Sequence, residues 1–225
     1  MRSGSRGLKN KHLKKIKNKP LIFYTIDYIK SLNFFKYIAV SSDSKIILSE
    51  CKKLGLIDLV KRPKNLSTSF SPKIPVIKHV MLEMEKKYNI KFDYIVDFDA
   101  TSPIRKKNDF KKAINYFIKT KADLLITGTK SRKNPYFNMI EEKNGKIQLV
   151  KKGNFIRRQD APKVYDMNAS FYIFKRNFLL NLKKLISKKT VFFEMSEISA
   201  FDIDNLIDFK INETLIKNDK KIYRN

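Results

Sequence analysis

The sequence predicts an α/β fold built on a doubly wound, mostly parallel sheet. Two observations predict it: short apolar segments alternate with amphipathic helical segments along most of the chain, and polar loops follow the apolar segments. The chain has 225 residues, of which 42% are hydrophobic and 12% aromatic, enough to bury a substantial core. We therefore predict a single domain over residues 1–225.

The first half of the chain carries the clearest alternation of strands and helices. Residues 1–19 form a basic loop rich in Gly, Ser, Lys and Asn, and Pro20 then opens a helix whose isoleucines recur at i, i+4 and i+7. Gly55 is placed to end the second helix. We predict further strands at 37–43, 94–100 and 123–129 and helices at 44–55, 75–89 and 107–121.

The pattern changes after Lys130. Residues 144–145 are Asn-Gly, the strongest short-range signal for a β-hairpin, which predicts an inserted arm at about 131–165. Strands are expected again at 168–176 and 190–195, and Asp204 is placed to cap a last helix at 205–218. The whole pattern is that of a Rossmann-like fold with an inserted arm.

Composition excludes several classes of protein. No apolar run is long enough to cross a membrane, and the basic N-terminus lacks the apolar segment of a secretory signal, so a cytoplasmic protein is expected. Cys51 is the single cysteine, which excludes an intramolecular disulfide. His12 and His79 are the two histidines and lie far apart in the sequence, which argues against a zinc cluster.

The net charge is +27, from 49 Lys and Arg against 22 Asp and Glu. Such a charge is compatible with a nucleic-acid-binding protein. The lysines, however, are spread over the whole chain, and no zinc finger, aromatic RNA-binding motif or basic heptad pattern accompanies them. We therefore expect a solvated basic surface and no specific nucleic-acid partner.

Three polar loops are candidates for chemistry, because ligands bind beyond the carboxyl ends of strands in such sheets. Residues 2–11, RSGSRGLKNK, combine glycines with four basic side chains, which suits a polyphosphate, although a basic tail would look the same. Residues 97–105 form a polar turn that is either a binding loop or a capped turn. Asp202 and Asp204 lie two apart in an extended segment, so that both carboxylates face one side. Such a pair suits Mg²⁺, and helix capping by Asp204 is the competing explanation.

These segments, in this order, resemble motifs of the N-acylneuraminate cytidylyltransferase family, the CMP-sialic acid synthetases. RSGSRGLKNKH is similar to the family's nucleotide-binding signature, DATSPIR to its Thr-Ser-Pro turn, RRQDAPKVYDMNASFYIF to its sugar-side segment, and FDID to its closing Asp-Ile-Asp. Within the family, the chain looks most like the bacterial legionaminic acid cytidylyltransferases. The resemblance implies transfer of CMP from CTP to the anomeric hydroxyl of a nonulosonic acid, with release of pyrophosphate, for surface glycan biosynthesis.

The resemblance also implies roles for individual residues. The catalytic residues would be Arg2, Lys9, Asp202 and Asp204. The triphosphate would be held by Arg2, Ser5, Arg6, Gly7 and Lys9, and the cytidine by Asn10 and Arg62. Asp202 and Asp204 would bind Mg²⁺ or Mn²⁺, and Asp99 and Arg158 would contact the sugar. The inserted arm of the family reaches a neighbouring subunit, which implies a homodimer.

The chain also departs from the family pattern. Asp99 stands where sialic acid enzymes usually carry Gln, and a carboxylate only accepts hydrogen bonds, which favours legionaminic acid with its second acylamino group. Family members carry a β-strand before the signature arginine, whereas Met1 directly precedes Arg2 here, so the first strand of the sheet is expected to be missing. The alternative functions are a 3-deoxy-manno-octulosonate cytidylyltransferase, whose Gln-Gly-Asp turn is absent, and a basic nucleic-acid-binding module.

Overall fold

The computed structural model describes residues 1–218 apart from residues 3, 5, 6 and 169. Its centre is a mixed sheet in the order β11 (Thr190–Glu194), β6 (Leu124–Lys130), β10 (Phe171–Lys175) and β5 (Tyr94–Phe98), with β9 (Tyr165–Met167) pairing with the end of β6. Strand β10 runs antiparallel to both β5 and β6, while β11 runs parallel to β6. Three of these strands therefore share one direction, and the predicted α/β class is confirmed with β10 reversed in the middle of the sheet.

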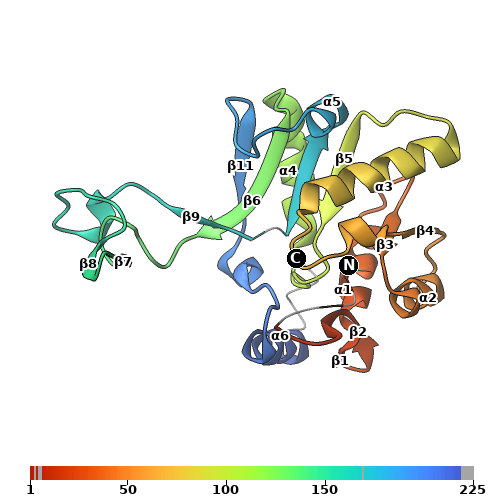
Figure 1. Cartoon of the computed structure of the whole chain (residues 1–225), viewed down its shortest axis with the longest axis horizontal. Coiled ribbons are helices and arrows are strands. Elements are labelled where there is room, and N and C mark those ends of the chain that lie inside the picture. The colour runs from red at the N-terminus through yellow and green to blue at the C-terminus, as the bar shows by residue number, and fades with distance from the viewer. Residues whose placement is uncertain (3, 5–6, 169, 219–225) are drawn as a thin grey trace.

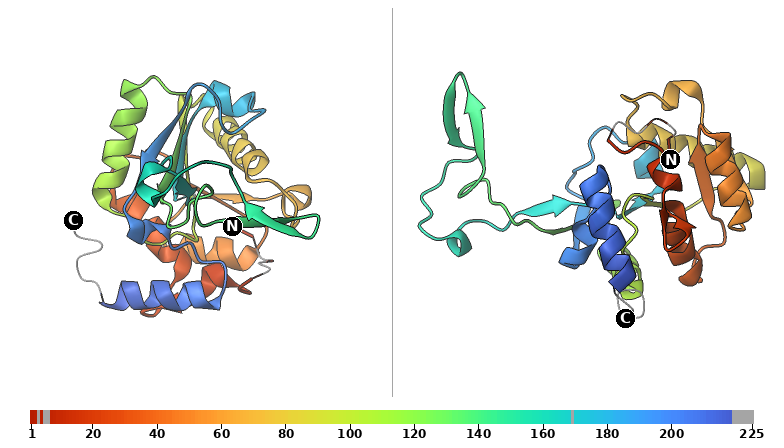
Figure 2. Two further views of the ribbon diagram at one scale, coloured as in Figure 1. Left: turned by 90° about the vertical axis from the view of Figure 1, so that its left-hand side faces the viewer. Right: turned by 90° about the horizontal axis from the view of Figure 1, so that it is seen from below.

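Helices flank the strands on both sides (Figures 1 and 2). The long helices are α1 (Leu21–Ser31), α3 (Lys73–Tyr88), α4 (Lys107–Lys119) and α6 (Leu206–Asn218), and shorter ones are α2 (Lys45–Lys53) and α5 (Arg176–Leu180). Aromatic side chains dominate the core under α4, where Phe110, Phe117 and Phe171 are fully buried beside the sheet. Fully burying a side chain of this kind stabilises the fold by roughly 1.5–3 kcal/mol.

The predicted strand at 37–43 is β3 (Ala39–Ser42), and it pairs in parallel with β4 (Asp58–Lys61), which the sequence pattern did not predict. This pair forms a sheet of its own and shares no ladder with β5. The end of the segment 1–19, predicted as loop, instead forms the short strand β1 (Lys15–Ile16), which pairs with β2 (Lys19–Pro20), and the helix expected to open at Pro20 begins at Leu21.

The predicted arm is present as a hairpin of β7 (Ile140–Lys143) and β8 (Lys146–Leu149). Asn144 and Gly145 both have positive φ, at 54° and 72°, as the tight turn requires. The hairpin projects away from the central sheet, on the far side from β3 and β4 (Figure 1). Among the described residues, no helix has the length and apolar character needed to cross a membrane.

Candidate active site

The carboxyl ends of β3, β4 and β5 meet the N-terminal loop and the loop before α6 at a cavity of about 1110 Å³. The side chains at this end of the cavity are mostly charged or polar, and we call it the polar end; it is lined by Arg2, Gly7, Lys11, Arg62, Thr68, Lys73, Asp97, Asp99, Thr101 and Asp204. Residues of all three loops singled out from the sequence therefore lie together at this edge of the sheet, beyond the strands.

The loop before α6 carries Asp202 and Asp204, and we call it the acidic loop. It lies close to the turn after β5. The Ser102 hydroxyl donates a hydrogen bond to the Asp202 carboxylate. Burial raises the pKa of Asp202 to about 6 against the effect of this hydrogen bond, and the negative charges of Asp99 and Asp204 add to the rise. Asp204 is 81% exposed and pairs with Lys11 Nζ at 3.0 Å. The two carboxylates are thus close enough to repel each other, and a nearby cation would favour the deprotonated form of Asp202.

Helix capping does not account for Asp204, and its placement as the cap of the last helix was wrong. The side chain of Asn205 accepts hydrogen bonds from the backbone N–H groups of Ile207 and Asp208, at 2.8 and 3.0 Å. Asp208 in turn accepts from the N–H groups of Asp204 and Asn205, both at 2.9 Å. Asn205 and Asp208 thus accept the free N–H groups at the start of the helix, in a reciprocal cap. The Asp204 carboxylate takes no part in the cap and instead faces solvent and pairs with Lys11.

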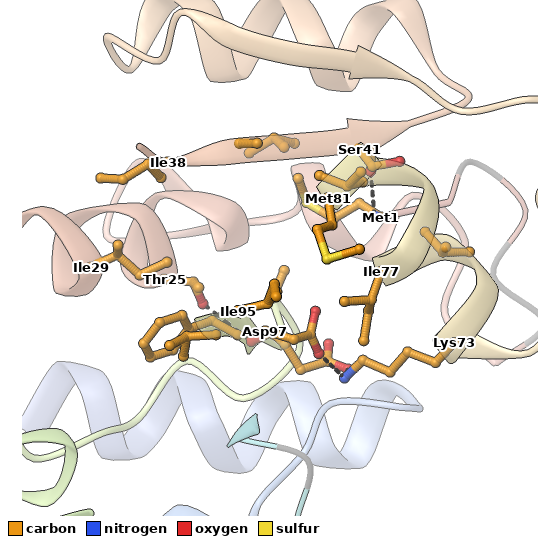
Figure 3. Close-up of a pocket in the computed structure, with 18 of the residues that line it drawn as sticks. Met1, Thr25, Ile29, Ile38, Ser41, Lys73, Ile77, Met81, Ile95 and Asp97 are labelled. Carbon is orange, nitrogen blue, oxygen red and sulfur yellow. Dashed lines mark hydrogen bonds and ion pairs between the residues drawn. The ribbon is translucent and has the colours of Figure 1, made fainter. Parts of the chain in front are cut away.

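Lys73, at the start of α3, was not predicted as a site residue. Its Nζ lies 2.7 Å from Asp97 of β5 (Figure 3). The same Nζ lies 3.2 Å from Asp99 in the following turn, so one ammonium bridges two carboxylates. Burial opposes the charge on Lys73, but the two carboxylates outweigh it and raise the pKa of Lys73 above its ordinary value. The spacing of Asp97 and Asp99 in a strand was a signal for such a cation.

Asp99, the predicted sugar-side residue, lies at the polar end with both oxygens engaged. Burial opposes its ionisation, but Lys73 and two hydrogen bonds from Thr101 hold the pKa of the Asp99 carboxyl well below its usual range. Asp99 is therefore a fixed anion. An ionised carboxylate presents only acceptor capacity to a ligand.

Arg105 ties the turn after β5 to the rest of the sheet. It is fully buried and donates hydrogen bonds to the Thr25 hydroxyl, the Ser170 carbonyl and the Asp99 carbonyl. A buried guanidinium with several oxygen partners is rigid. The segment 97–105 is therefore a braced loop that fixes Asp99, Thr101 and Ser102 at the site.

The N-terminal loop packs directly against the acidic loop. A Cβ on Gly7 would lie 2.2 Å from the Asp204 carbonyl oxygen, so the two backbones are in contact there. Arg2 donates to the Thr68 carbonyl at 2.6 Å, while Lys9 and Asn10 are exposed to solvent. The predicted triphosphate residues Ser5 and Arg6 lie outside the described residues.

Arg62, at the end of β4, reaches the same edge. Its guanidinium donates to the Ser41 hydroxyl at 3.2 Å and to the Ser41 carbonyl at 3.1 Å. Burial lowers the pKa of Arg62, and Arg2 lowers it further. Two arginines therefore approach each other here from separate segments, an arrangement that an anion would stabilise.

Arg158 is not brought to the polar end. It lies in a short 3₁₀ turn, Arg158–Asp160, between the hairpin and β9, and donates to the Ser131 carbonyl at 3.0 Å. The segment between the hairpin and β9 thus holds this arginine outside the cavity.

The carboxylate oxygens of Asp202 and Asp204 in the acidic loop are hard donors that suit a metal ion such as Mg²⁺. Among the described residues no group of three or more His, Cys, Asp or Glu side chains is arranged to hold one. Mg²⁺ needs no such group, because it is commonly held by one or two carboxylates together with substrate phosphates and water. Asp202 and Asp204, of which Asp204 lies at the polar end beside Lys11 of the basic N-terminal loop, fit that requirement.

Solved structures of nucleotidyltransferases have the same fold. A CMP-2-keto-3-deoxy-manno-octonic acid synthetase, solved with CTP, superposes with a TM-score of 0.70 at 12% identity, covering 96% of this chain and 95% of that one. At this identity the likeness shows the fold alone.

Curated relatives are much closer in sequence. The chain is 44% identical to the post-translational flagellin modification protein B of Campylobacter coli and 43% identical to the CMP-N,N'-diacetyllegionaminic acid synthase of Campylobacter jejuni, each over 96% of this chain and 92% of the relative. The cytidylyltransferase family model matches residues 1–225. With this match over its whole length, the chain belongs to the cytidylyltransferase family and is a nucleotidyltransferase.

Proposed function

We propose that this enzyme transfers CMP from CTP to the anomeric hydroxyl of a nonulosonic acid and releases pyrophosphate. The family membership and the 43% identity to a CMP-N,N'-diacetyllegionaminic acid synthase support the reaction. One structural observation carries it: the paired acidic residues lie against the basic N-terminal loop, with Gly7 in contact with Asp204 and Lys11 ion-paired to it. A metal-bound triphosphate needs both acidic and basic groups at one place.

The cationic side chains would bind and orient CTP. Arg2 and Lys9 hold the leaving pyrophosphate, and the N–H groups around Gly7 approach the phosphates, together with Ser5 and Arg6. Asn10 and Arg62 contact the cytidine. Transfer of a nucleotidyl group depends mainly on positioning and charge stabilisation, so these residues hold the α-phosphorus in line with the attacking hydroxyl.

Asp202 and Asp204 would hold Mg²⁺ or Mn²⁺, which when bound neutralises charge on the triphosphate. Without a cation, two carboxylates beside a triphosphate would repel it. When bound, a divalent ion would favour the deprotonated carboxylate of Asp202, against the burial that raises its pKa. Ser102 orients Asp202 by its hydrogen bond.

Legionaminic acid is the proposed sugar. Asp99 is an anion held by Lys73 and Thr101, and its remaining acceptor capacity favours a donor group such as an acylamino N–H. The relatives' names point the same way, since one of them is a legionaminic acid synthase.

We propose a homodimer on the basis of the exposed apolar face of the hairpin arm. In the hairpin, Ile140, Ile147 and Leu149 share one face with Glu142, because cross-strand partners and residues two apart point the same way. The two isoleucines are 66% and 63% exposed. An apolar face of this kind on a projecting arm favours contact with a second subunit, and Arg158 would then approach the partner's site. With CTP as a substrate drawn from the nucleotide pool, the reaction would take place in the cytoplasm.

The nucleic-acid-binding alternative is less well supported. A phosphate-backbone binder gains nothing from Asp202 and Asp204 at its anion site. The octulosonate alternative rests on a likeness of fold at 12% identity.

Pyrophosphate release tests the proposal. With Mg²⁺ and a nonulosonic acid, we expect release from CTP and much less from UTP, ATP or GTP. Omitting either the sugar acid or the metal should abolish it. Release that is independent of the sugar acid, or CTP-competitive binding of duplex DNA at physiological salt, would contradict the assignment.

A further inference from the structure

Three charged side chains meet at the polar end of the cavity: Lys73, Asp97 and Asp99, which we call the Lys73 cluster. Figure 3 shows Lys73 extending from α3 to Asp97. Asp97 and Asp99 are two residues apart in extended backbone, so both carboxylates point to the α3 side of β5. Two residues earlier on this side, Ile95 packs into the apolar cluster that contains Ile77. This side of β5 therefore changes from apolar to charged where it reaches the polar end.

Stability alone does not explain the Lys73 cluster. A buried ion pair is often no more stabilising than apolar side chains of similar volume, because the charges lose their hydration. Two carboxylates against one ammonium also leave one net negative charge. Lys73 is the first residue of α3, where the positive end of the helix dipole disfavours a cation. Charged groups held in a cleft at such a cost are typical of functional sites.

The ammonium group of Lys73 has one N–H that none of the described residues accepts. An ammonium has three N–H donors, and the partners of Nζ are Asp97 at 2.7 Å and Asp99 at 3.2 Å. The Tyr172 ring attracts the positive charge, but its centroid lies 5.5 Å from Nζ, beyond hydrogen-bond distance. The Lys73 side chain lines the cavity and is 37% exposed. Its third N–H is therefore open to a ligand.

Asp99 offers an acceptor beside this donor. One of its carboxylate oxygens accepts hydrogen bonds from the Thr101 N–H and hydroxyl, at 3.1 and 2.9 Å. The other accepts from Lys73, and a carboxylate oxygen has a second lone pair. Lys73 and Asp99 thus present one donor and one acceptor side by side, which suits a neutral ligand that carries both kinds of group.

The charges of the cavity separate the two substrates. The basic side chains Arg2, Lys11 and Arg62 at the polar end attract the triphosphate of CTP. The net negative charge of the Lys73 cluster repels a triphosphate, whereas the hydroxyl and acylamino groups of a sugar acid are uncharged and both donate and accept. The ribose hydroxyls of CTP are the competing occupant of the cluster.

We propose that Lys73 determines specificity for the sugar acid: its third N–H donates to a neutral oxygen of this substrate, while Asp99 accepts from a neighbouring N–H or O–H of the same molecule. This role rests on the proposed function, in which the sugar acid is the acceptor of CMP. Lys73 then contacts the substrate itself, in addition to fixing Asp99.

Calorimetry of ligand binding tests this role without turnover. N,N'-Diacetyllegionaminic acid is titrated into the protein in the presence of CMP, which cannot react, and CTP is titrated separately. Asp97→Asn is the starting variant, because it balances the charges of the cluster, and Lys73→Met is added to it. We expect the added substitution to weaken binding of the sugar acid by about 10- to 100-fold, as the loss of a charged hydrogen bond does. Binding of CTP should change little.

Lys175 offers a matched control outside the cavity. Its Nζ pairs with Asp123 at 2.9 Å, and its side chain is 35% exposed, much as for Lys73. Lys175→Met added to Asp123→Asn should leave both affinities unchanged. Thermal unfolding of each variant checks the fold.

A second starting variant separates direct contact from an effect through Asp99. In the protein with Asp97→Asn and Asp99→Asn, Lys73→Met should still weaken binding of the sugar acid by about tenfold. This background leaves no unpaired carboxylate in the cluster, so it keeps the test valid if the first variant unfolds. No further loss there would show that Lys73 acts only through Asp99 and would overturn the proposal.

Two other results would also overturn this role of Lys73. One is an equal loss of CTP affinity, which would assign the cluster to the ribose, and the other is a lack of sugar-acid binding by the unmodified protein. Binding of the sugar acid that depends on Lys73, without pyrophosphate release from CTP, would support the contact and contradict the proposed reaction alone.

Discussion

Asp202 and Asp204 are the residues on which the proposed chemistry depends most. Asp202→Asn and Asp204→Asn should each lower kcat by roughly 100-fold or more, because each removes a carboxylate that would hold the metal ion at the triphosphate. Glu213→Gln, which removes a carboxylate paired with Lys217 on α6, is the matched control and should keep normal turnover. Thermal unfolding of each variant checks the fold. Near-normal rates for both Asp variants at saturating Mg²⁺ would show that the metal lies elsewhere.

Asp99 decides the choice of sugar acid in this account. Asp99→Gln should shift kcat/KM from legionaminic acid toward N-acetylneuraminic acid, by about 10- to 100-fold if a single polar contact sets the preference. Asp97→Asn is the control, because it removes the other carboxylate paired with Lys73. If the two variants change the preference equally, the effect belongs to Lys73 and the assignment to Asp99 fails.

At the scale of elements, the N-terminal loop and the acidic loop are in such close backbone contact at Gly7 that no side chain fits between them. Gly7→Ala should force these loops apart, since its Cβ would lie 2.2 Å from the Asp204 carbonyl, and we expect a raised KM for CTP. Gly4→Ala introduces a methyl group with nothing within 4 Å and should behave like the unmodified protein. Steady-state kinetics with CTP as the varied substrate makes the comparison, and equal KM values would remove Gly7 from the nucleotide site.

The arm carries the prediction about assembly. Ile140→Asp combined with Ile147→Asp should convert a dimer to a monomer, because charges would replace the exposed apolar side chains of one hairpin face. Lys146 lies on the opposite face of the hairpin, so Lys146→Ser serves as the control. Sedimentation velocity gives the mass directly. A monomeric starting protein, or a dimer that survives both substitutions, would contradict the proposed interface.

For the molecule as a whole, acid should destabilise the fold through His12. Burial, together with the positive charges of the Met1 amine and Lys11, lowers the pKa of His12 to about 3. The unfolded chain, with a pKa near 6.5, therefore binds more protons between these values, and stability falls as the pH falls from about 6.5 toward 3. The loss at pH 5 is about 2 kcal/mol.

His12→Gln should remove this part of the pH dependence. Urea unfolding of both proteins at pH 8, where His12 is neutral in both states, gives the cost of repacking, and the difference that remains at pH 5 gives the effect of the proton. Parallel stability curves for the two proteins between pH 8 and pH 5 would contradict the assignment.

Local signals in the sequence were sufficient to predict most of the fold. Apolar periodicity located the helices, and the Asn144-Gly145 turn located the arm, because these depend on neighbours in the chain. Strand β4 was missed because only four residues with one charged at each end form it. The reversed direction of β10 depends on how the chain returns from the arm, which no local pattern records.

The candidate site was also predicted in part: the residues of its loops were singled out from the sequence, whereas contacts between distant segments were not. The polar loops that follow the strands were found from their residues alone. Lys73 was missed because α3 brings it to Asp97 and Asp99 only in the folded chain. Asn205 was overlooked as the helix cap because Asp204, one residue earlier, has an equally suitable side chain. Arg158, predicted on the sugar side, lies away from the cavity, because it belongs to the segment between the hairpin and β9.

The identity of the product tests the central claim most directly. The enzyme should be incubated with CTP, Mg²⁺ and an equimolar mixture of N,N'-diacetyllegionaminic, N-acetylneuraminic, pseudaminic and 3-deoxy-manno-octulosonic acids, and the nucleotide products measured by mass spectrometry at low conversion. We predict that CMP-N,N'-diacetyllegionaminic acid forms fastest and that pyrophosphate appears in equal amount. Formation of CMP-3-deoxy-manno-octulosonic acid as the main product, or the absence of any CMP-sugar, would contradict the account.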